Sequence, residues 1–452
     1  MTTPTPPRAV TACGAPEPPA TRIAAAVVLA LLAIGYGLVC VRGNDFQTFR
    51  EVGRFALDRA DVYANTPSTG MRVYYAPPFA LLLAPFALLP WKVSAFLWYA
   101  LKLAALAWLA RLLWREVRPR VPDRPWERAA YLALPFAAVL NPLNVEFKLG
   151  QVNLFVFAFV LLAVRMLRRG SPWAAALCFS LALVKVTPWV FLPWLALRRQ
   201  WGFLVRLAAV ALGWVAALAV WFGPGRVAGL FLGWFRASGD KLGLEHVAYF
   251  ENQSLAGVVA RLALAWPPLQ ADVLGMPLWR LLPAAATAAL LAAVAGAVAR
   301  DRFRRRLPEA EFAFLCAVML LASPDSRWAH LVTLLGPFML LAVLAADLRV
   351  LRPAPRRDGD AGGATVAGAS DRARARLSRA IVAVTALALV AFELLSRDVV
   401  GKGAERAIRA SGLHTAVLAA VAALTGVLMY ARSAGLAGAD ASGAPAADAT
   451  PP

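Results

Sequence analysis

The sequence predicts an all-α polytopic membrane protein, and two observations predict it. Hydrophobic residues make up 60% of the 452 residues and the mean hydropathy is +0.62, which is too apolar for a soluble protein of this size. The apolar residues also form stretches long enough to cross the ~30 Å hydrocarbon core of a bilayer as helices. We expect about 12 transmembrane helices (range roughly 10 to 13), with short loops and interfacial helices on the outer face.

The candidate spans follow from the apolar stretches in chain order. They are 23–41, 92–113, 128–145, 152–167, 172–185, 186–197, 203–222, 279–299, 310–322, 328–346, 380–397 and 414–431. The full apolar stretch 77–113 is too long for one crossing, and four prolines interrupt its first part, where each removes a backbone donor. We therefore expect 77–90 to be a partial or interfacial helix, and we expect the same of 255–266.

The net charge of +21 does not indicate a nucleic-acid-binding surface, because the arginines lie in short loops between apolar segments. Five arginine clusters occupy alternate loops: 111–128, 165–169, 198–206, 300–306 and 349–379. The positive-inside rule places these loops, and with them both termini, on the cytoplasmic side. No small-residue cleavage site follows 23–41, so this segment is expected to be a retained helix.

Composition divides the chain into five parts. They are a disordered, Pro-rich N-terminus (1–22), a transmembrane core (23–346), a flexible cytoplasmic linker (347–379), a C-terminal transmembrane hairpin (380–431) and a disordered tail (432–452). The four cysteines lie far apart, which gives neither a metal-binding spacing nor a disulfide framework.

Asp45 is the best candidate for chemistry. It lies a few residues beyond the first apolar segment, in Arg42-Gly43-Asn44-Asp45-Phe46-Gln47, and opens a polar loop that runs to Tyr75. A carboxylate held at the membrane boundary can accept a proton as a general base. The alternatives are a solvated loop aspartate or a cap for a helix that starts near Phe46.

Lys185 is the second unusual residue, because it lies at the tip of a tight helical hairpin. Each arm spans about 20 Å at 1.5 Å per residue and cannot cross a ~30 Å core. Lys185 should therefore line a cavity part-way to the outer interface, where a cation needs an anionic partner from the protein or a ligand. The alternatives are a lysine that reaches the headgroups or one paired with Glu146.

The predicted topology places five polar clusters on the outer face: Asp45 with its loop, 141–153, the loop 223–254, 323–330 and 397–409. The chain also contains, in this order, Asp45, Ala60-Asp61-Val62-Tyr63, Tyr75-Ala76-Pro77-Pro78, Gly150-Gln151-Val152-Asn153, Lys185-Val186-Thr187-Pro188, Asn252-Gln253-Ser254-Leu255 and the segment 323–330. The order and spacing of these motifs resemble glycosyltransferase family 87 of the GT-C superfamily. The resemblance covers roughly residues 25–346, although the family's usual Tyr-Pro-Pro is here Tyr-Ala-Pro-Pro. It implies a GT-C-type helical bundle with its catalytic core in 23–346.

The resemblance also implies a hexosyltransferase of the bacterial cytoplasmic membrane. Such an enzyme takes a sugar, often mannose, from a polyprenyl-phosphate donor and passes it to a hydroxyl of a glycolipid or glycan outside the cytoplasm. Carried over by position, Asp45 is the general base of an inverting displacement, which needs one carboxylate, whereas retaining hydrolysis needs a pair. No Asp-x-Asp pair lies on the outer face, so we expect no metal and no cofactor.

The leaving phosphate needs positive charge in a low-dielectric site, and Lys185, Arg327 and His330 are the outward-facing candidates. The alternatives are a headgroup anchor formed by Arg327 with Trp328, and a structural hydrogen bond from His330.

Sugar or acceptor contacts are expected from two further groups of residues. The amides of Gln151, Asn153, Asn252 and Gln253 suit sugar hydroxyls, but they equally suit helix caps and interhelical hydrogen bonds. Tyr63 and Tyr75 suit stacking on a sugar, but they equally suit an interfacial aromatic belt.

Two other functions remain open at this point. A transporter or flippase for lipid-linked or anionic solutes would need polar residues that continue to the cytoplasmic side, and few occur at midplane. A ligase that moves a whole glycan usually has a large, basic extracytoplasmic loop, and the longest loop here, 223–278, is modest.

Overall fold

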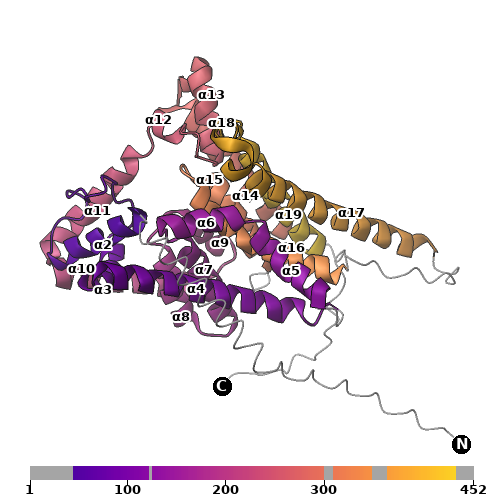
Figure 1. Ribbon diagram of the computed structural model, residues 1–452, viewed down its shortest axis with the longest axis horizontal. Coiled ribbons are helices and arrows are strands. Elements are labelled where there is room, and N and C mark those ends of the chain that lie inside the picture. The colour runs from indigo at the N-terminus through magenta and orange to yellow at the C-terminus, as the bar shows by residue number, and fades with distance from the viewer. Residues whose placement is uncertain (1–43, 122–124, 300–308, 349–363, 434–452) are drawn as a thin grey trace, which may run out of the picture.

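The computed structural model describes residues 44–121, 125–299, 309–348 and 364–433, and these residues form a nearly all-helical protein (Figure 1). The sheet in this part is one short antiparallel hairpin of β1 (Asp272–Val273) and β2 (Met276–Pro277). The all-α class is therefore confirmed. The predicted first span (23–41), the predicted N-terminus (1–22) and nearly all of the predicted tail lie outside the described residues.

The first helices are α2 (Asn44–Leu57), α3 (Pro78–Leu88), α4 (Trp91–Val117), α5 (Pro125–Ala137), α6 (Leu140–Leu149) and α7 (Asn153–Arg168). They depart from the predictions at two places. The predicted polar loop from Asp45 to Tyr75 is wrong in its first part, which is helix α2. The predicted single span 128–145 is also wrong, because the chain breaks between α5 and α6.

The middle of the chain contains the predicted hairpin and one helix that the sequence did not reveal. The elements are α8 (Pro172–Ala182), the 3-10 helix η1 (Thr187–Val190), α9 (Phe191–Leu197), α10 (Trp201–Phe222), α11 (Pro224–Asp240), α12 (Leu244–Val247), α13 (Leu255–Ala265), the 3-10 helix η2 (Pro267–Gln270) and α14 (Leu278–Ala299). Helix α11 occupies much of the predicted polar loop 223–254, so that prediction is wrong.

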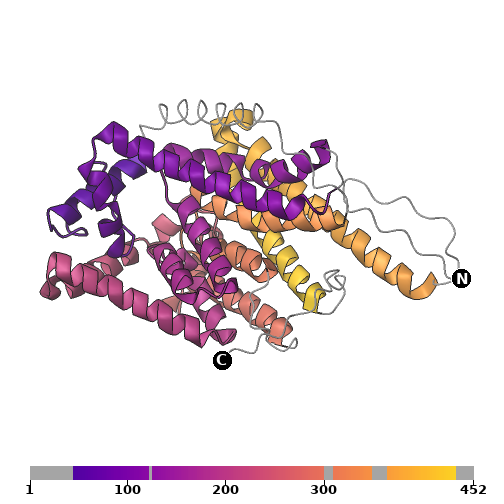
Figure 2. The same ribbon diagram turned by 90° about the horizontal axis from the view of Figure 1, so that it is seen from below.

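The last elements form a long helix and a hairpin. They are α15 (Glu309–Ala322), the 3-10 helix η3 (Trp328–Leu334), α16 (Leu335–Asp347), α17 (Ala364–Leu389), the π-helix η4 (Val390–Leu394), α18 (Arg397–Ala410) and α19 (Leu413–Ser433). Helix α17 begins inside the predicted linker 347–379, whose second half is thus helical. Figures 1 and 2 both show α17 projecting from the rest of the bundle.

Four helices in the described residues are long and apolar enough to cross a membrane, and up to six do so if each bent pair is one span. The four are 91–117, 201–222, 328–347 and 375–394, and the bent pairs are α6 with α7, at 112°, and α18 with α19, at 52°. The protein is therefore a membrane protein by this measure, while the total of about 12 spans stays a prediction.

Helix α2 is fixed against α3 by an apolar face. Phe46, Phe49, Val52 and Ala56 recur at three- and four-residue spacing and are buried. A Cβ at Gly53 would overlap the Leu83 carbonyl of α3, so glycine is what permits the close approach. This packing sets the direction in which the first turn of α2 points.

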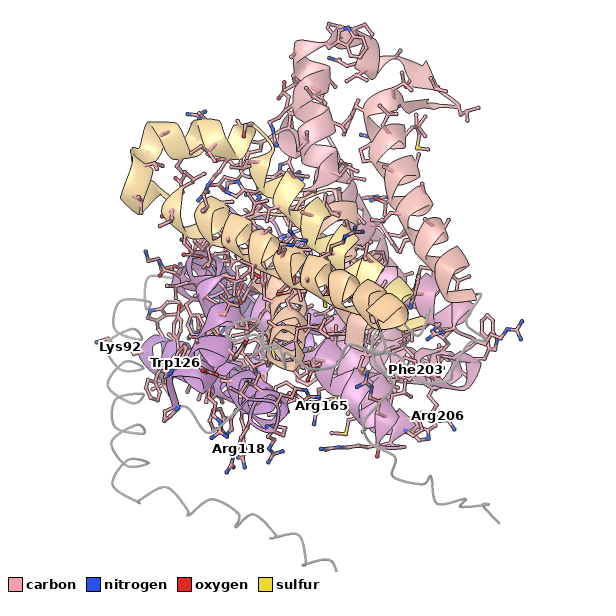
Figure 3. All side chains as sticks on the ribbon, turned by 90° about the vertical axis from the view of Figure 1, so that its right-hand side faces the viewer. Lys92, Arg118, Trp126, Arg165, Phe203 and Arg206 are labelled. Atoms are coloured by element: carbon pink, nitrogen blue, oxygen red, sulfur yellow. The ribbon has the colours of Figure 1, made fainter. Side chains whose placement is uncertain are left out.

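Basic side chains at three helix ends lie on one edge of the molecule. Arg118 caps α4, Arg165 lies in the last turn of α7, and Arg206 lies near the start of α10. All three lie at the lower edge of Figure 3, away from the β1–β2 hairpin at its top. The chain thus reaches the same edge when it leaves α4, leaves α7 and enters α10.

Candidate active site

A cavity of about 1330 Å³ lies among α2, α6, α11, α18 and the segment 323–330. Small-molecule sites usually measure about 300–1,000 Å³, so this cavity is larger than a usual single-ligand site. Six of the residues singled out in the sequence line it: Asp45, Tyr75, Gln151, Lys185, Arg327 and His330. Folding thus brings together residues that lie up to 285 positions apart (330 minus 45).

Asp45 lies in the first turn of α2, where the positive end of the helix dipole favours a carboxylate. Its neighbour Phe46 stacks on Trp98 of α4 with ring centroids 5.0 Å apart. The indole nitrogen of Trp98 donates to the Gly150 carbonyl at 2.9 Å. These contacts join the start of α2 to the turn that carries Gln151.

Gly150 is required at this turn for two reasons. Its φ of +71° lies in the left-handed region, and a Cβ there would lie 2.6 Å from the Cβ of Phe46. The next residue, Gln151, donates its amide to Asp45 Oδ2 at 2.5 Å and accepts from the Tyr75 hydroxyl at 3.1 Å. Gln151 therefore holds the Asp45 carboxylate in one orientation.

The electrostatic setting of Asp45 differs from that of its neighbours. Burial raises the pKa of its carboxyl above the ordinary range, although the hydrogen bond from Gln151 acts in the opposite direction. Four acidic residues line the cavity: Asp45, Glu251, Asp325 and Glu405. Within the described part of the chain, Asp45 alone among them forms no ion pair. It is thus the carboxylate best able to accept a proton.

Lys185 lies in the turn between α8 and η1, at the tip of the hairpin, and lines the cavity as predicted. The Val184 carbonyl accepts a hydrogen bond from the backbone of Ala76 at 2.8 Å, which joins the tip to the segment that carries Tyr75. The Lys185 ammonium lies 5.9 Å from the centroid of the Tyr75 ring. It is therefore held close to the Gln151 and Asp45 group.

A buried polar chain lies behind Lys185. Its ammonium donates to Asn153 Oδ1, and Asn153 Nδ2 donates to Glu146 at 2.9 Å. Glu146 in turn pairs with Lys102 at 3.0 Å, and both side chains are fully buried. The alternative of a direct Lys185–Glu146 pair is therefore wrong. Asn153 lies between the two charges, and it does not line the cavity, where a sugar contact was predicted.

Arg327 belongs to a second charged group, which is centred on Asp325. Asp325 pairs with Arg327 at 3.1 Å, with Lys241 at 3.2 Å and approaches His246 at 3.8 Å. Trp328 is only 4% exposed, so the alternative of an Arg327–Trp328 headgroup anchor is wrong. His330 accepts a hydrogen bond from the Arg327 backbone at 3.2 Å through Nδ1.

The charges of this group stabilise one another. Burial alone would raise the pKa of Asp325, but the hydrogen bond with His246 and the nearby Lys241 and Arg327 charges hold it below its usual range. Burial lowers the pKa of Lys241, and the Asp325 carboxylate opposes that shift. Asp325 therefore stays ionised and keeps two cations beside the cavity.

Three other residues predicted to contact a ligand have structural contacts instead. Asn252 and Gln253 are fully buried and do not line the cavity. Asn252 accepts from the Ser326 backbone at 2.9 Å and donates to the Pro324 carbonyl at 2.7 Å, which holds the segment before Arg327. The Tyr63 hydroxyl donates to the Tyr75 carbonyl at 2.6 Å and also lies outside the lining. The contacts of Asn252 are internal hydrogen bonds, as the alternative for the amides expected, whereas the aromatic-belt alternative for Tyr63 stays a prediction.

Sequence reasoning missed Lys241 and Asp325. Lys241 fell in a segment interpreted as a polar loop, and its neighbourhood depends on the unrecognised helix α11. Asp325 lies inside the segment 323–330, two residues before Arg327, and an acid at that spacing from an arginine was a usable signal. Together, the described residues place one carboxylate without an ion pair among them, and several cations, around one cavity.

Comparison with known proteins identifies a family. The family model of glycosyltransferase family 87 matches residues 73–324, a range that includes Tyr75, Gln151 and Lys185 but not Asp45 or Arg327. No solved structure matches the chain.

Three characterised relatives also match. The chain is 30% identical over 319 residues to a polyprenol-phosphate-mannose-dependent α-(1-2)-phosphatidylinositol mannoside mannosyltransferase of Mycolicibacterium smegmatis, covering 67% of this chain and 70% of the relative. Two polyprenol-phosphate-mannose-dependent α-(1-2)-phosphatidylinositol pentamannoside mannosyltransferases match shorter parts. The one from Mycolicibacterium smegmatis is 32% identical over 33% of this chain and 35% of its own length. The one from Mycobacterium tuberculosis is 30% identical over 38% of this chain and 42% of its own length.

The resemblance found in the sequence motifs is thereby confirmed. The matched range covers more than half of the chain, and the first relative is aligned over more than two thirds of both proteins. The chain belongs to glycosyltransferase family 87 and is a glycosyltransferase.

Proposed function

We propose that this chain transfers a hexose, mannose, from a polyprenyl-phosphate donor to a hydroxyl of a glycolipid or glycan on the extracytoplasmic face of the bacterial cytoplasmic membrane. The transfer is an inverting single displacement with Asp45 as general base. The activities of the three relatives support a polyprenyl-phosphate mannose donor and a glycolipid acceptor. The cavity supports two ligands, because its volume exceeds that of a usual single-ligand site.

One observation carries the assignment of the base. Asp45 lines the cavity without an ion pair in the described residues, and Gln151 orients its carboxylate. Each of the other acidic lining residues is neutralised by an arginine or a lysine. A carboxylate with raised proton affinity and no cationic partner is the group suited to take a proton from a hydroxyl.

The reaction balances with these groups. The acceptor hydroxyl gives its proton to Asp45 as its oxygen forms a bond to the anomeric carbon of the sugar. On the opposite face the bond between that carbon and the phosphate oxygen breaks, and its electron pair stays on the polyprenyl phosphate. Configuration is inverted because attack and departure are in line.

Positive charge stabilises the leaving phosphate. Lys185, Arg327 and Lys241 line the same cavity, and Arg327 can bind a phosphate through two parallel hydrogen bonds. His330 lies beside Arg327 and completes the predicted set. Because these side chains supply the charge, the proposal includes neither a metal ion nor another cofactor.

The proposal also includes the membrane arrangement. We propose a GT-C-type bundle of about 12 spans with both termini in the cytoplasm. The grouping of Arg118, Arg165 and Arg206 at one edge of the molecule supports a cytoplasmic position for that edge (Figure 3). The cavity would then open on the other side, where lipid-linked donors present their sugars.

Membrane vesicles test the reaction and its side together. Right-side-out and inverted vesicles that contain the full chain receive a water-soluble, short-chain polyprenyl phosphomannose with labelled mannose. We expect free prenyl phosphate and a labelled glycolipid in right-side-out vesicles only. An intact donor in both preparations would reject the transferase and favour the flippase, and turnover confined to inverted vesicles would reject the extracytoplasmic site.

The pH profile tests the state of Asp45. A base acts only when ionised, so kcat/KM should rise with pH through the carboxyl pKa, which burial raises above the ordinary value of about 3.9. The Gln151 hydrogen bond lowers that pKa, so Gln151→Leu should move the acidic limb to still higher pH. Asp58 is exposed and does not line the cavity, so Asp58→Asn should leave the acidic limb of the pH profile in place. A limb that does not move in Gln151→Leu would contradict this role.

A further inference from the structure

Helix α18 contributes one wall of the cavity, although it belongs to the C-terminal hairpin and not to the predicted core. Glu405 and Arg409 lie one turn apart on α18, and both line the cavity. Glu251 and Trp328 line it beside them. We call Glu251, Glu405 and Arg409 with Trp328 the α18 wall.

Hydrogen bonds join the α18 wall to neighbouring segments of the chain. The Arg409 carbonyl accepts from Gln253 at 3.3 Å, and the Ala410 carbonyl accepts from Arg261 at 3.0 Å. Nearby, Glu393 of η4 accepts hydrogen bonds from the backbone of Asn141 at the start of α6. The hairpin is therefore a fixed part of the site and not an appendage.

The charge of the α18 wall differs from that of the phosphate side. Arg409 is neutralised twice, by Glu405 at 2.5 Å and Glu251 at 3.4 Å, and its guanidinium lies 4.3 Å from the Trp328 ring centroid. The wall thus has two carboxylates for one cation. Elsewhere in the lining, three cations (Lys185, Lys241 and Arg327) accompany the paired acid Asp325 and Asp45, and Arg72 and Lys148 add two more basic side chains.

This difference in charge favours a different ligand in each part of the cavity: a phosphate beside the cations and an uncharged sugar at the α18 wall. A phosphate at the α18 wall would meet two carboxylates and an arginine whose charge is already neutralised, which is unfavourable in a cavity of low dielectric. Sugar hydroxyls are donors as well as acceptors, so they can donate to carboxylate oxygens and accept from a guanidinium. Asn141 and Asn144 of α6 add amides to the same lining.

We infer that the α18 wall is the acceptor subsite, and that it binds an uncharged, polyhydroxylated sugar by donating and accepting hydrogen bonds through Glu405, Glu251 and Arg409. The inference rests on the proposed transfer and adds the place and chemical class of the acceptor. The donor phosphate occupies the cationic part of the cavity, and the two substrates meet at Asp45.

Kinetics of the purified full chain in lipid nanodiscs test this inference. The donor is synthetic polyprenyl phosphomannose and the acceptor probe is octyl α-mannoside. Glu405→Gln and Glu251→Gln each keep the side-chain volume but replace a carboxylate with an uncharged amide, which is a weaker hydrogen-bond acceptor. Each should raise the KM of octyl α-mannoside by about tenfold or more and change the KM of the donor by less than about twofold. Lys402→Gln, on the exposed face of α18, is the matched control and should change neither.

The outcomes separate the inference from the proposed function. A rise in the donor KM, or an unchanged acceptor KM in both glutamate variants, overturns the acceptor subsite. A wild-type protein that hydrolyses the donor but never glycosylates the probe overturns it as well. A wild-type protein that leaves the donor intact overturns the proposed function itself. Glu251→Gln guards against misfolding, because its side chain is 35% exposed whereas that of Glu405 is buried.

Discussion

Asp45→Asn should lower kcat by about 10²–10⁴-fold, the usual contribution of a general base. The amide has nearly the same shape, so it can keep a contact with Gln151, but it cannot accept the proton of an attacking hydroxyl. The KM of the donor should stay nearly constant, since the phosphate is bound by other residues. The measurement is the initial rate of prenyl phosphate release and sugar transfer by the purified variant in nanodiscs.

Asp58→Asn is the matched control for this substitution. Asp58 lies just after α2 and pairs with Arg54 at the surface, where both side chains are more than half exposed. Its replacement should leave turnover unchanged. If Asp45→Asn, with an unaltered gel-filtration profile, retained turnover within about threefold of the wild type, Asp45 would not be the base.

Lys185→Met should reduce kcat/KM for the donor by about 10²–10³-fold, because loss of one preorganised donor to a developing charge has that effect in other enzymes. Methionine keeps the apolar stem at the hairpin tip and removes only the ammonium. Lys102 still neutralises Glu146 behind it, so the variant leaves no unpaired buried carboxylate. Both the KM of the donor and kcat should change, which distinguishes this variant from Asp45→Asn.

Lys92→Met, at the exposed start of α4, removes a charge of the same kind away from the cavity and should have no effect. The rates of both lysine variants are measured over a series of donor concentrations. A Lys185→Met protein with normal donor kinetics would show that the phosphate lies elsewhere in the cavity.

The sequence predicted most helices because apolar stretches of suitable length leave few alternatives, but it failed where tertiary contacts decide. The segment 223–254 was predicted to be a polar loop, yet it contains α11, in which Gly233 permits close packing: a Cβ there would lie 3.0 Å from the Tyr63 Cβ. The break between α5 and α6 interrupts a continuous apolar run. Glu393, 252 positions away, accepts the free backbone N–H of Asn141 there, and no local pattern reveals that contact.

The site was predictable where unusual polar residues stand out in apolar sequence. Asp45, Lys185 and Arg327 were found in this way and lie around one cavity. Asn153 and Asn252 were found by the same criterion but serve the protein's own buried groups, since an amide suits an internal carboxylate as well as a sugar. Only spatial neighbours distinguish the two roles.

A structure of the full chain with a non-cleavable polyprenyl phosphonate analogue of the mannose donor tests the central claim most directly. We predict the phosphonate oxygens within ~3 Å of Lys185 or Arg327, with Asp45 facing the anomeric carbon from the side opposite the phosphonate. A sugar bound outside this cavity, or Asp45 on the same face as the phosphonate, would contradict the account.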